Sequence, residues 1–171
     1  EAQPLFNKSA NGNVWLVSKY KLADNPNEEM LALSKINLKK ELVADKQFGK
    51  MLSANYQPDS SATIALKNYS PNELVYTFNS RTDQLAVFSE IYYDKGWNAY
   101  INNKNVPYFR ADYLLRAMPL TAGNYEITFR FEPNSYKNGN ILSLISSMLL
   151  TLGFVGIIFA RWKKSSKSKK I

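Results

Sequence analysis

The chain has 171 residues, with 22 lysines and arginines, 14 aspartates and glutamates, and neither cysteine nor histidine. The lack of these two residue types excludes a disulfide, a zinc–thiolate site, a cysteine nucleophile and a histidine general base. Six of the basic residues fall in the last eleven positions, which leaves 16 basic against 14 acidic residues elsewhere. This balance argues against nucleic-acid binding, which needs a basic face on the folded domain.

Short strands are predicted along most of residues 10–133. Runs rich in β-branched and aromatic residues are separated by Pro, Gly, Asn, Asp and Ser, which favour turns. These runs are 14–21, 62–68, 73–80, 84–92, 97–101, 113–120 and 124–132. In the last run, four apolar residues at alternate positions from Tyr125 to Phe131 are expected to share one face. The spacing predicts a mainly β fold, an antiparallel β-sandwich.

One short helix is predicted beside the sandwich, over residues 24–33. Its sequence begins with an Asp or Asn cap followed by acidic residues, which suit a helix N-terminus. Met30, Leu31 and Leu33 are the residues that we expect it to bury. The polar segment 46–59 is predicted to be a loop.

A single transmembrane helix is predicted at residues 141–160. This segment, ILSLISSMLLTLGFVGIIFA, carries no charge, and about 20 apolar residues are needed to cross the hydrocarbon core. The alternative, a helix buried in a soluble protein, predicts charges on one face, and this segment has none. The serines of the segment can bond to carbonyls of their own helix, so they are compatible with lipid.

The basic tail at 161–171 predicts the orientation of this helix. Basic residues concentrate on the cytoplasmic side of membranes, and Trp162 suits the interface. We therefore expect a cytoplasmic tail and an extracytoplasmic domain at residues 1–140. The sequence starts at Glu1 without Met or a signal peptide, so a cleaved signal or further membrane spans are expected upstream.

The run SEIYYDKGWNAYINNK at 89–104 resembles the C-terminal part of the YfhO family of bacterial multi-pass membrane proteins. The likeness continues through RADYLLRAMP at 110–119, AG at 122–123, FRFEP at 129–133 and SLIS at 143–146, with weaker matches at 12–17 and 69–72. In two departures, Lys95 is an extra residue before Gly96, and Asn103 stands where the family usually has Gly. Asn tolerates the left-handed conformation that such a turn needs, so we expect the hairpin to survive.

The resemblance implies a longer parent protein in the bacterial cytoplasmic membrane, with many spans upstream. The family is similar to membrane glycosyltransferases that use polyprenyl-phosphate sugars, which implies glycosylation of cell-envelope polymers with a lipid-linked sugar. The catalytic acid of such enzymes lies in an early external loop, outside this sequence. The resemblance therefore implies a non-catalytic accessory domain with the last span and no cofactor. Its expected partners are the lipid bilayer and the upstream transmembrane segments of the same parent chain.

The aromatic residues at 92–108 have two interpretations, a surface that stacks on sugar rings or the filling of a sandwich. Adjacent Tyr92 and Tyr93 face opposite sides of a strand, so they cannot share one platform. Buried aromatics are also the commoner case. We therefore expect mostly core, with one or two rings at a surface.

The charged candidates are weaker. Arg110 and Arg116 could hold a lipid-linked phosphate, although an internal pair between Asp112 and one arginine is the favoured interpretation. Glu90 and Asp94 are the nearest approach to a catalytic carboxylate pair, but their spacing fixes no separation. No catalytic residue and no metal site is predicted. The predicted contacts to a glycan or a polyprenyl-phosphate sugar are Tyr93, Trp97, Arg110 and Arg116.

Two other functions remain open at this point. The chain could be a carbohydrate-binding or adhesion module on a single membrane anchor, or a structural domain of an envelope complex. Residues before Glu1 separate the enzyme from the module, because apolar segments of spanning length favour the enzyme and a cleaved signal peptide favours the module.

Overall fold

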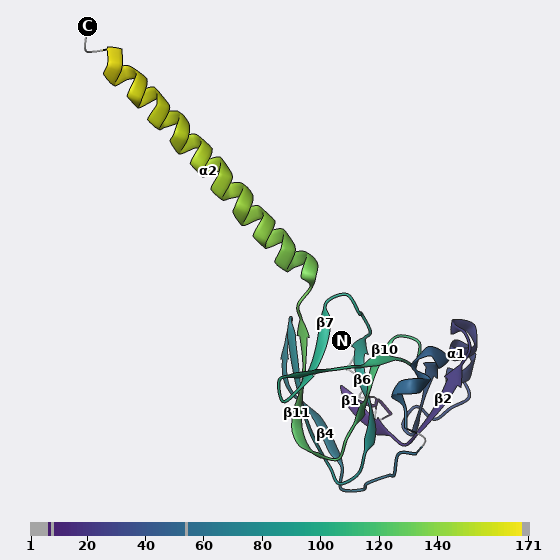
Figure 1. The fold of residues 1–171 in the computed structure, drawn as a ribbon. Coiled ribbons are helices and arrows are strands. Elements are labelled where there is room, and N and C mark those ends of the chain that lie inside the picture. Colours follow the sequence, from purple (N-terminus) through teal and green to yellow (C-terminus); the bar gives the residue numbers. More distant parts are fainter. Residues whose placement is uncertain (1–6, 8, 54, 169–171) are drawn as a thin grey trace, which may run out of the picture. The chain divides into compact units, whose positions relative to one another are not determined.

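The computed structural model of the protein describes residues 7, 9–53 and 55–168. It divides into two units, Glu1–Phe131 and Glu132–Ile171. The first is a β domain with one short α-helix, and the second is a long helix (Figure 1).

The strands of the β domain form two sheets. Sheet A has six strands in the order β1-β6-β10-β9-β3-β2, and sheet B has five in the order β4-β5-β11-β7-β8. Every pair is antiparallel except β2–β3, which is parallel. The predicted mainly β fold is confirmed. The elements are β1 Val14–Val17, β2 Lys19–Ala23, α1 Pro26–Leu33, β3 Glu41–Asp45, the 3-10 helix η1 Lys46–Met51, β4 Thr63–Ser70, β5 Glu73–Ser80, β6 Gln84–Ile91, β7 Trp97–Ile101, β8 Lys104–Val106, β9 Phe109–Ala111, β10 Leu115–Leu120, β11 Gly123–Phe131 and α2 Asn134–Ser168.

Residues of both sheets build one hydrophobic core, the inter-sheet core. Phe88 of sheet A meets Tyr76 and Phe129 of sheet B edge to face, with ring centroids 4.9 and 5.0 Å apart. Ile127 and Phe129 are fully buried, as the alternation in 124–132 predicts. Such aromatic packing adds to the free energy gained from the buried area itself.

The opposite face of sheet A carries a second core, the sheet-A core. It contains Leu85 and Val87 of β6 together with Phe109 of β9, and Phe48 and Met51 of η1 pack against it. Since β6 contributes alternate residues to both cores, its first five residues are all buried. A continuous buried run of this kind marks a central strand covered on both faces.

The predicted single strand at 14–21 is two strands. β1 pairs with β6 and β2 pairs with β3, which places them at opposite edges of sheet A, although only Ser18 separates them. Sheet A must therefore curl until its two edges meet at Ser18. The amides of Ser18 and Lys19 both donate to the carbonyl of Lys40, at 3.1 and 3.2 Å. Alternation predicts extended backbone, but it does not reveal that the partner strand changes.

Helix α1 forms where it is predicted, yet its buried residue is different. The Asn25 side chain accepts from the amide of Glu28 at 3.0 Å, which caps the helix. Met30 and Leu31 are 50% and 63% exposed, whereas Glu29 is fully buried. The prediction that Met30 and Leu31 are buried is wrong, because the helix instead turns Glu29 inward, where Arg110 and the Tyr113 amide bind its carboxylate.

Three strands, β3, β8 and β9, were not predicted. β8 and β9 have only three residues each, too short for a clear alternation, and β3 contains a continuous apolar run, at 42–44, that does not alternate. The predicted loop at 46–59 begins with η1, because the Asp45 side chain accepts from the amide of Gln47 at 2.9 Å and caps this turn.

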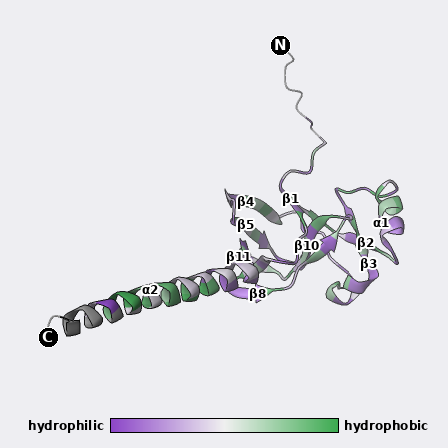
Figure 2. Ribbon diagram, turned by 90° about the horizontal axis from the view of Figure 1, so that it is seen from above, coloured by the Kyte–Doolittle hydropathy of each residue, from purple (hydrophilic) through white to green (hydrophobic). Residues whose placement is uncertain are grey.

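The predicted C-terminal apolar helix is confirmed. Within α2, residues Asn134–Phe159 form a stretch long and apolar enough to cross a membrane, and it appears mainly green in Figure 2. Ser146 donates to the carbonyl of Leu142 at 2.9 Å, and Thr151 to that of Ser147 at 2.8 Å. These hydroxyls are thus satisfied within their own helix, as lipid requires.

Candidate functional site

The hairpin of β7 and β8 carries much of the aromatic run. Its two-residue turn consists of Asn102 and Asn103, which have φ angles of 50° and 61°. Positive φ at both central residues is the hairpin turn that favours Asn and Gly. Asn103 therefore supports the hairpin, as predicted.

Two of the four tyrosines in this run, Tyr92 and Tyr108, pack against core residues. Tyr92 lies between Phe48 and Tyr108, with centroid distances of 6.4 and 5.4 Å, and Tyr108 packs on Phe129 at 5.4 Å. The Tyr108 hydroxyl shares its proton between the carbonyls of Tyr93 and Trp97, each 3.1 Å away, and burial raises the pKa of Tyr108 to about 12. Tyr93 itself is 48% exposed. These rings join the two cores and leave Tyr93 at the surface.

Trp97 rests against a buried arginine. The guanidinium carbon of Arg116 lies 4.4 Å from the Trp97 ring centroid and 5.2 Å from that of Phe129. Arg116 is 3% exposed, and its Nε donates to the carbonyl of Ile91 at 3.0 Å. Burial lowers its pKa, and the aromatic faces offset part of the cost of burying the charge. Arg116 thus positions the indole from within the domain.

Arg110 belongs to a different cluster. It donates to Glu29 Oε2 and to the Tyr113 carbonyl, both at 3.0 Å, and the second Glu29 oxygen accepts from the Tyr113 amide at 2.8 Å. Asp112 pairs with neither arginine, so the expected internal pair is wrong. Its Oδ1 accepts from the amide of Val43 at 2.9 Å instead.

Asp112 is buried in the turn between β9 and β10. Its Oδ2 has no hydrogen-bond partner among the described residues. Burial raises its pKa to about 6, and the nearby charge of Glu29 acts in the same direction. No group of acidic side chains in the described ranges is arranged to hold a metal ion.

A hollow of about 200 Å³, the Trp97 hollow, lies beside this hairpin. Its lining combines aromatic rings with a carboxylate and two amides. Rings can contact the apolar faces of a sugar, while carboxylate and amide groups bond to hydroxyls. Of the four predicted contacts, Trp97 lines the hollow, Arg116 holds that ring, and Tyr93 and Arg110 lie outside the lining. The lining residues are Tyr92, Asp94, Trp97, Asn98, Ala99, Asn105, Val106, Pro107 and Tyr108.

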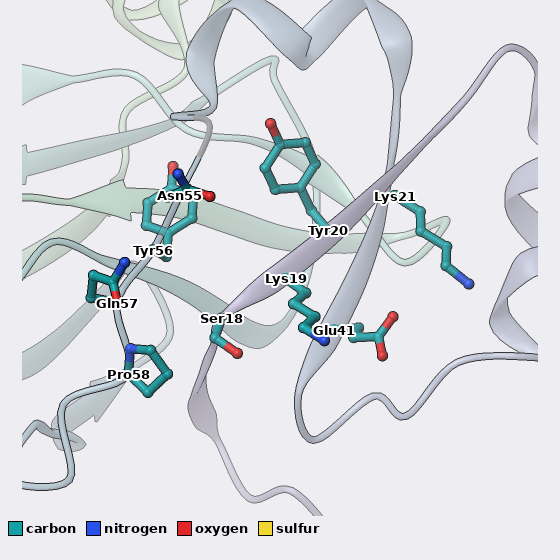
Figure 3. Close-up of a pocket in the computed structure, with 9 residues that line it drawn as sticks. All are labelled: Ser18, Lys19, Tyr20, Lys21, Glu41, Asn55, Tyr56, Gln57 and Pro58. Carbon is teal, nitrogen blue, oxygen red and sulfur yellow. The ribbon is translucent and has the colours of Figure 1, made fainter.

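A longer depression, the Lys–Tyr groove, was not predicted. It consists of two adjoining hollows of about 620 and 610 Å³ that share Ser18 and Pro58. Figure 3 shows the residues that line the first hollow. Segments far apart in the sequence meet there because the chain pairs with β6 before Ser18 and with β3 after it. The first hollow is lined by Ser18, Lys19, Tyr20, Lys21, Glu41, Asn55, Tyr56, Gln57 and Pro58, and the second by Leu16, Val17, Ser18, Lys39, Lys40, Pro58, Asp59, Ser60, Ala62 and Gln84.

Comparison with known proteins gives one family. A family model described as "Bacterial membrane protein YfhO" matches residues 34–143. The "Uncharacterized protein YfhO" of Bacillus subtilis (strain 168) is 29% identical over 102 residues, which cover 56% of this chain and 12% of that protein. The chain thus spans about an eighth of the length of this relative. No solved structure matches.

Proposed function

This chain belongs to the YfhO family of bacterial membrane proteins, and from that membership we propose a role in glycosylating cell-envelope polymers with a lipid-linked sugar. In this role the β domain is an extracytoplasmic accessory domain, and α2 is the last span of the parent protein. The transfer chemistry belongs to the upstream spans. The β domain holds the glycan that receives the sugar.

The Trp97 hollow is the observation that carries this proposal. It lies inside the region matched by the family, and it offers ring faces next to a carboxylate and amides. Arg116 packs against the Trp97 ring and Tyr108 donates to the Trp97 carbonyl, so the aromatic wall is formed before any ligand arrives. A preformed site binds with a smaller loss of conformational entropy.

The basic tail supports the orientation. Lysines and arginines follow the apolar stretch of α2 at once, and such residues concentrate on the cytoplasmic side. The β domain, at the other end of that stretch, then lies outside the cell, where envelope glycans are found.

Binding of oligosaccharides to the full 171-residue chain in nanodiscs of neutral lipid tests the proposal. Asp94→Asn and Asn105→Ala change exposed lining residues, and we expect each to weaken glycan binding about tenfold, because a lost hydrogen bond to a charged or amide group costs about 1–3 kcal/mol. The matched control is Asn27→Ala on α1, an exposed amide outside the hollow. Thermal unfolding should be unchanged in all three variants.

Sugar incorporation into envelope polymers, measured in cells that carry the whole parent gene, tests the second half of the proposal. The two hollow variants should lower incorporation, and the Asn27→Ala variant should not. Absence of glycan binding at millimolar concentration contradicts the role of the hollow. Lost binding with normal incorporation identifies a carbohydrate-binding module instead.

A further inference from the structure

The Lys–Tyr groove follows the free edge of sheet A. Strand β2 pairs with β3 on one side only, and the segment 55–58 faces it across the groove (Figure 3). The edge of a sheet presents backbone N–H and C=O groups that have no partner within the sheet. One wall of the groove therefore offers hydrogen-bonding groups at regular intervals.

Four lysines give the groove its charge. Lys19 and Lys21 line the first hollow, and Lys39 and Lys40 line the second. None of the four forms an ion pair with any residue that the structure describes. Because charges elsewhere in the chain outside the tail are nearly balanced, this is a local excess of positive charge.

The two acidic residues of the groove, Asp59 and Glu41, reduce this excess without cancelling it, because four lysines line the same groove. Asp59 accepts four hydrogen bonds, from the amide and hydroxyl of Ser61, the hydroxyl of Ser80 and the amide of Arg81. These bonds hold the pKa of Asp59 well below its usual range, so Asp59 keeps its negative charge, and they direct its oxygens toward Ser61, Ser80 and Arg81. Glu41 lies opposite Lys19 in the β2–β3 register without an ion pair to it.

The walls between the lysines suit sugar rings. Tyr56 is 5% exposed and its hydroxyl accepts from the amide of Ser53 at 3.1 Å, while Tyr20 packs against the sheet-A core, so both rings are fixed. Gln57 has an exposed side chain, and its carbonyl is held by the Gln84 amide at 2.9 Å. The half-buried Tyr20 ring and the exposed Gln57 amide are groups that can contact a sugar face and its hydroxyls, whereas the buried Tyr56 offers a ligand almost no surface.

We propose that the Lys–Tyr groove is a second binding site, which takes an anionic glycan, a sugar chain with repeated negative charges. Its two hollows adjoin at Ser18 and Pro58 and are each about three times the volume of the Trp97 hollow, so they fit a chain rather than one ring. Lys19 and Lys21 lie two residues apart on a strand, hence about 7 Å from each other on the same face. The groove shares no lining residue with the Trp97 hollow, and this site does not depend on glycosyl transfer.

Dextran sulfate and neutral dextran are suitable probes, because they share a sugar backbone and differ in charge. The full chain in nanodiscs of uncharged lipid should bind dextran sulfate, less tightly as the salt concentration rises, and neutral dextran far more weakly. Replacing Lys19, Lys21, Lys39 and Lys40 with Gln should weaken dextran sulfate binding about tenfold or more, since each charge contributes a factor of a few. The control with the same loss of charge replaces Lys35, Lys50, Lys95 and Lys104, which lie outside the groove.

Three results overturn the proposal. Equal losses in the two quadruple variants show attraction by net charge alone. Equal binding of neutral dextran and dextran sulfate shows that the lysines do not select the ligand. Binding to phosphatidylglycerol vesicles without binding to dextran sulfate assigns the groove to lipid headgroups. Unchanged thermal unfolding of the groove variant, whose four lysines are exposed, ensures that a loss of binding is not a loss of fold.

Discussion

Replacing Arg110 with Met should destabilise the β domain by about 3 kcal/mol. The side chain of Glu29 is 1% exposed and that of Arg110 is 24% exposed, with 3.0 Å between the guanidinium Nη2 and Glu29 Oε2. Removing one partner of a buried ion pair costs about 3–5 kcal/mol, because the remaining charge stays buried without compensation. Water reaches Arg110 in part, so the lower end of this range applies.

This loss corresponds to a fall in the melting temperature of about 10 °C for a domain of this size. Circular dichroism of the full chain in non-ionic detergent can follow the β signal during heating. Glu29→Gln removes the charge but keeps an oxygen that can accept from the Tyr113 amide. The Glu29→Gln/Arg110→Met double variant should therefore recover about half of the lost stability.

Two outcomes would refute this reasoning. One is an Arg110→Met variant that melts within about 2 °C of the wild type, because Glu29 would then tolerate burial alone. The other is a double variant that loses the sum of the two single losses, because the side chains would then be energetically independent.

Three further predictions concern the turns of the β domain. Because the pKa of Asp112 in the folded state is about 6, above its unfolded value, the free energy of unfolding should fall by about 2–3 kcal/mol as pH rises from about 4 to 7. Urea unfolding at the two pH values measures this difference, and Asp112→Asn should remove it. Gly96 has a φ of 147°, and a Cβ there would lie 2.6 Å from the Phe131 ring, so Gly96→Ala should lower the free energy of unfolding by about 2 kcal/mol, measured by thermal unfolding. In the control Gly12→Ala, the added Cβ meets nothing within 4 Å, and the loss should be about half of that. Asn103→Gly should raise the melting temperature by about 2–4 °C, since Gly adopts a φ of 61° without strain, and a lower melting temperature would contradict the role of this turn.

Strands flanked by clear turn residues could be predicted from the sequence. The predicted limits of β5 and β7 coincide with Glu73–Ser80 and Trp97–Ile101, because turn residues flank both runs. The apolar helix could be predicted from composition alone, since a lipid-spanning segment needs no tertiary partner. In these elements the sequence pattern alone predicts the observed secondary structure.

The burial of Glu29 could not be predicted. An acidic residue in the first turn of a helix normally stabilises the helix from the solvent side, and Glu28 does so. The partner of Glu29 is Arg110, 81 positions away in the chain. Only the tertiary fold brings Glu29 and Arg110 together. Because Glu29 faces inward, its neighbour Met30 faces the solvent.

The Lys–Tyr groove was missed for a similar reason. Its lysines look like an ordinary solvated surface in the sequence, because they come from two separate segments, at 19–21 and 39–40. The two segments come together at Ser18, where the chain changes its pairing from β6 to β3 and the Ser18 and Lys19 amides bond to Lys40. The Trp97 hollow was found in part, since its aromatic residues lie close together in one run.

The position of β11 has a consequence for the order of folding. β11 is the last strand to be synthesised, yet it occupies the middle of sheet B, between β5 and β7. Until it emerges, the hairpins β4–β5 and β7–β8 have no strand to join them, and the inter-sheet core lacks Ile127 and Phe129. The strand edges of the domain therefore stay exposed until the chain has been synthesised almost to the start of the apolar helix α2. The β domain is thus completed only shortly before α2 is synthesised, and a chain that stops before residue 123 leaves two unjoined hairpins prone to aggregation.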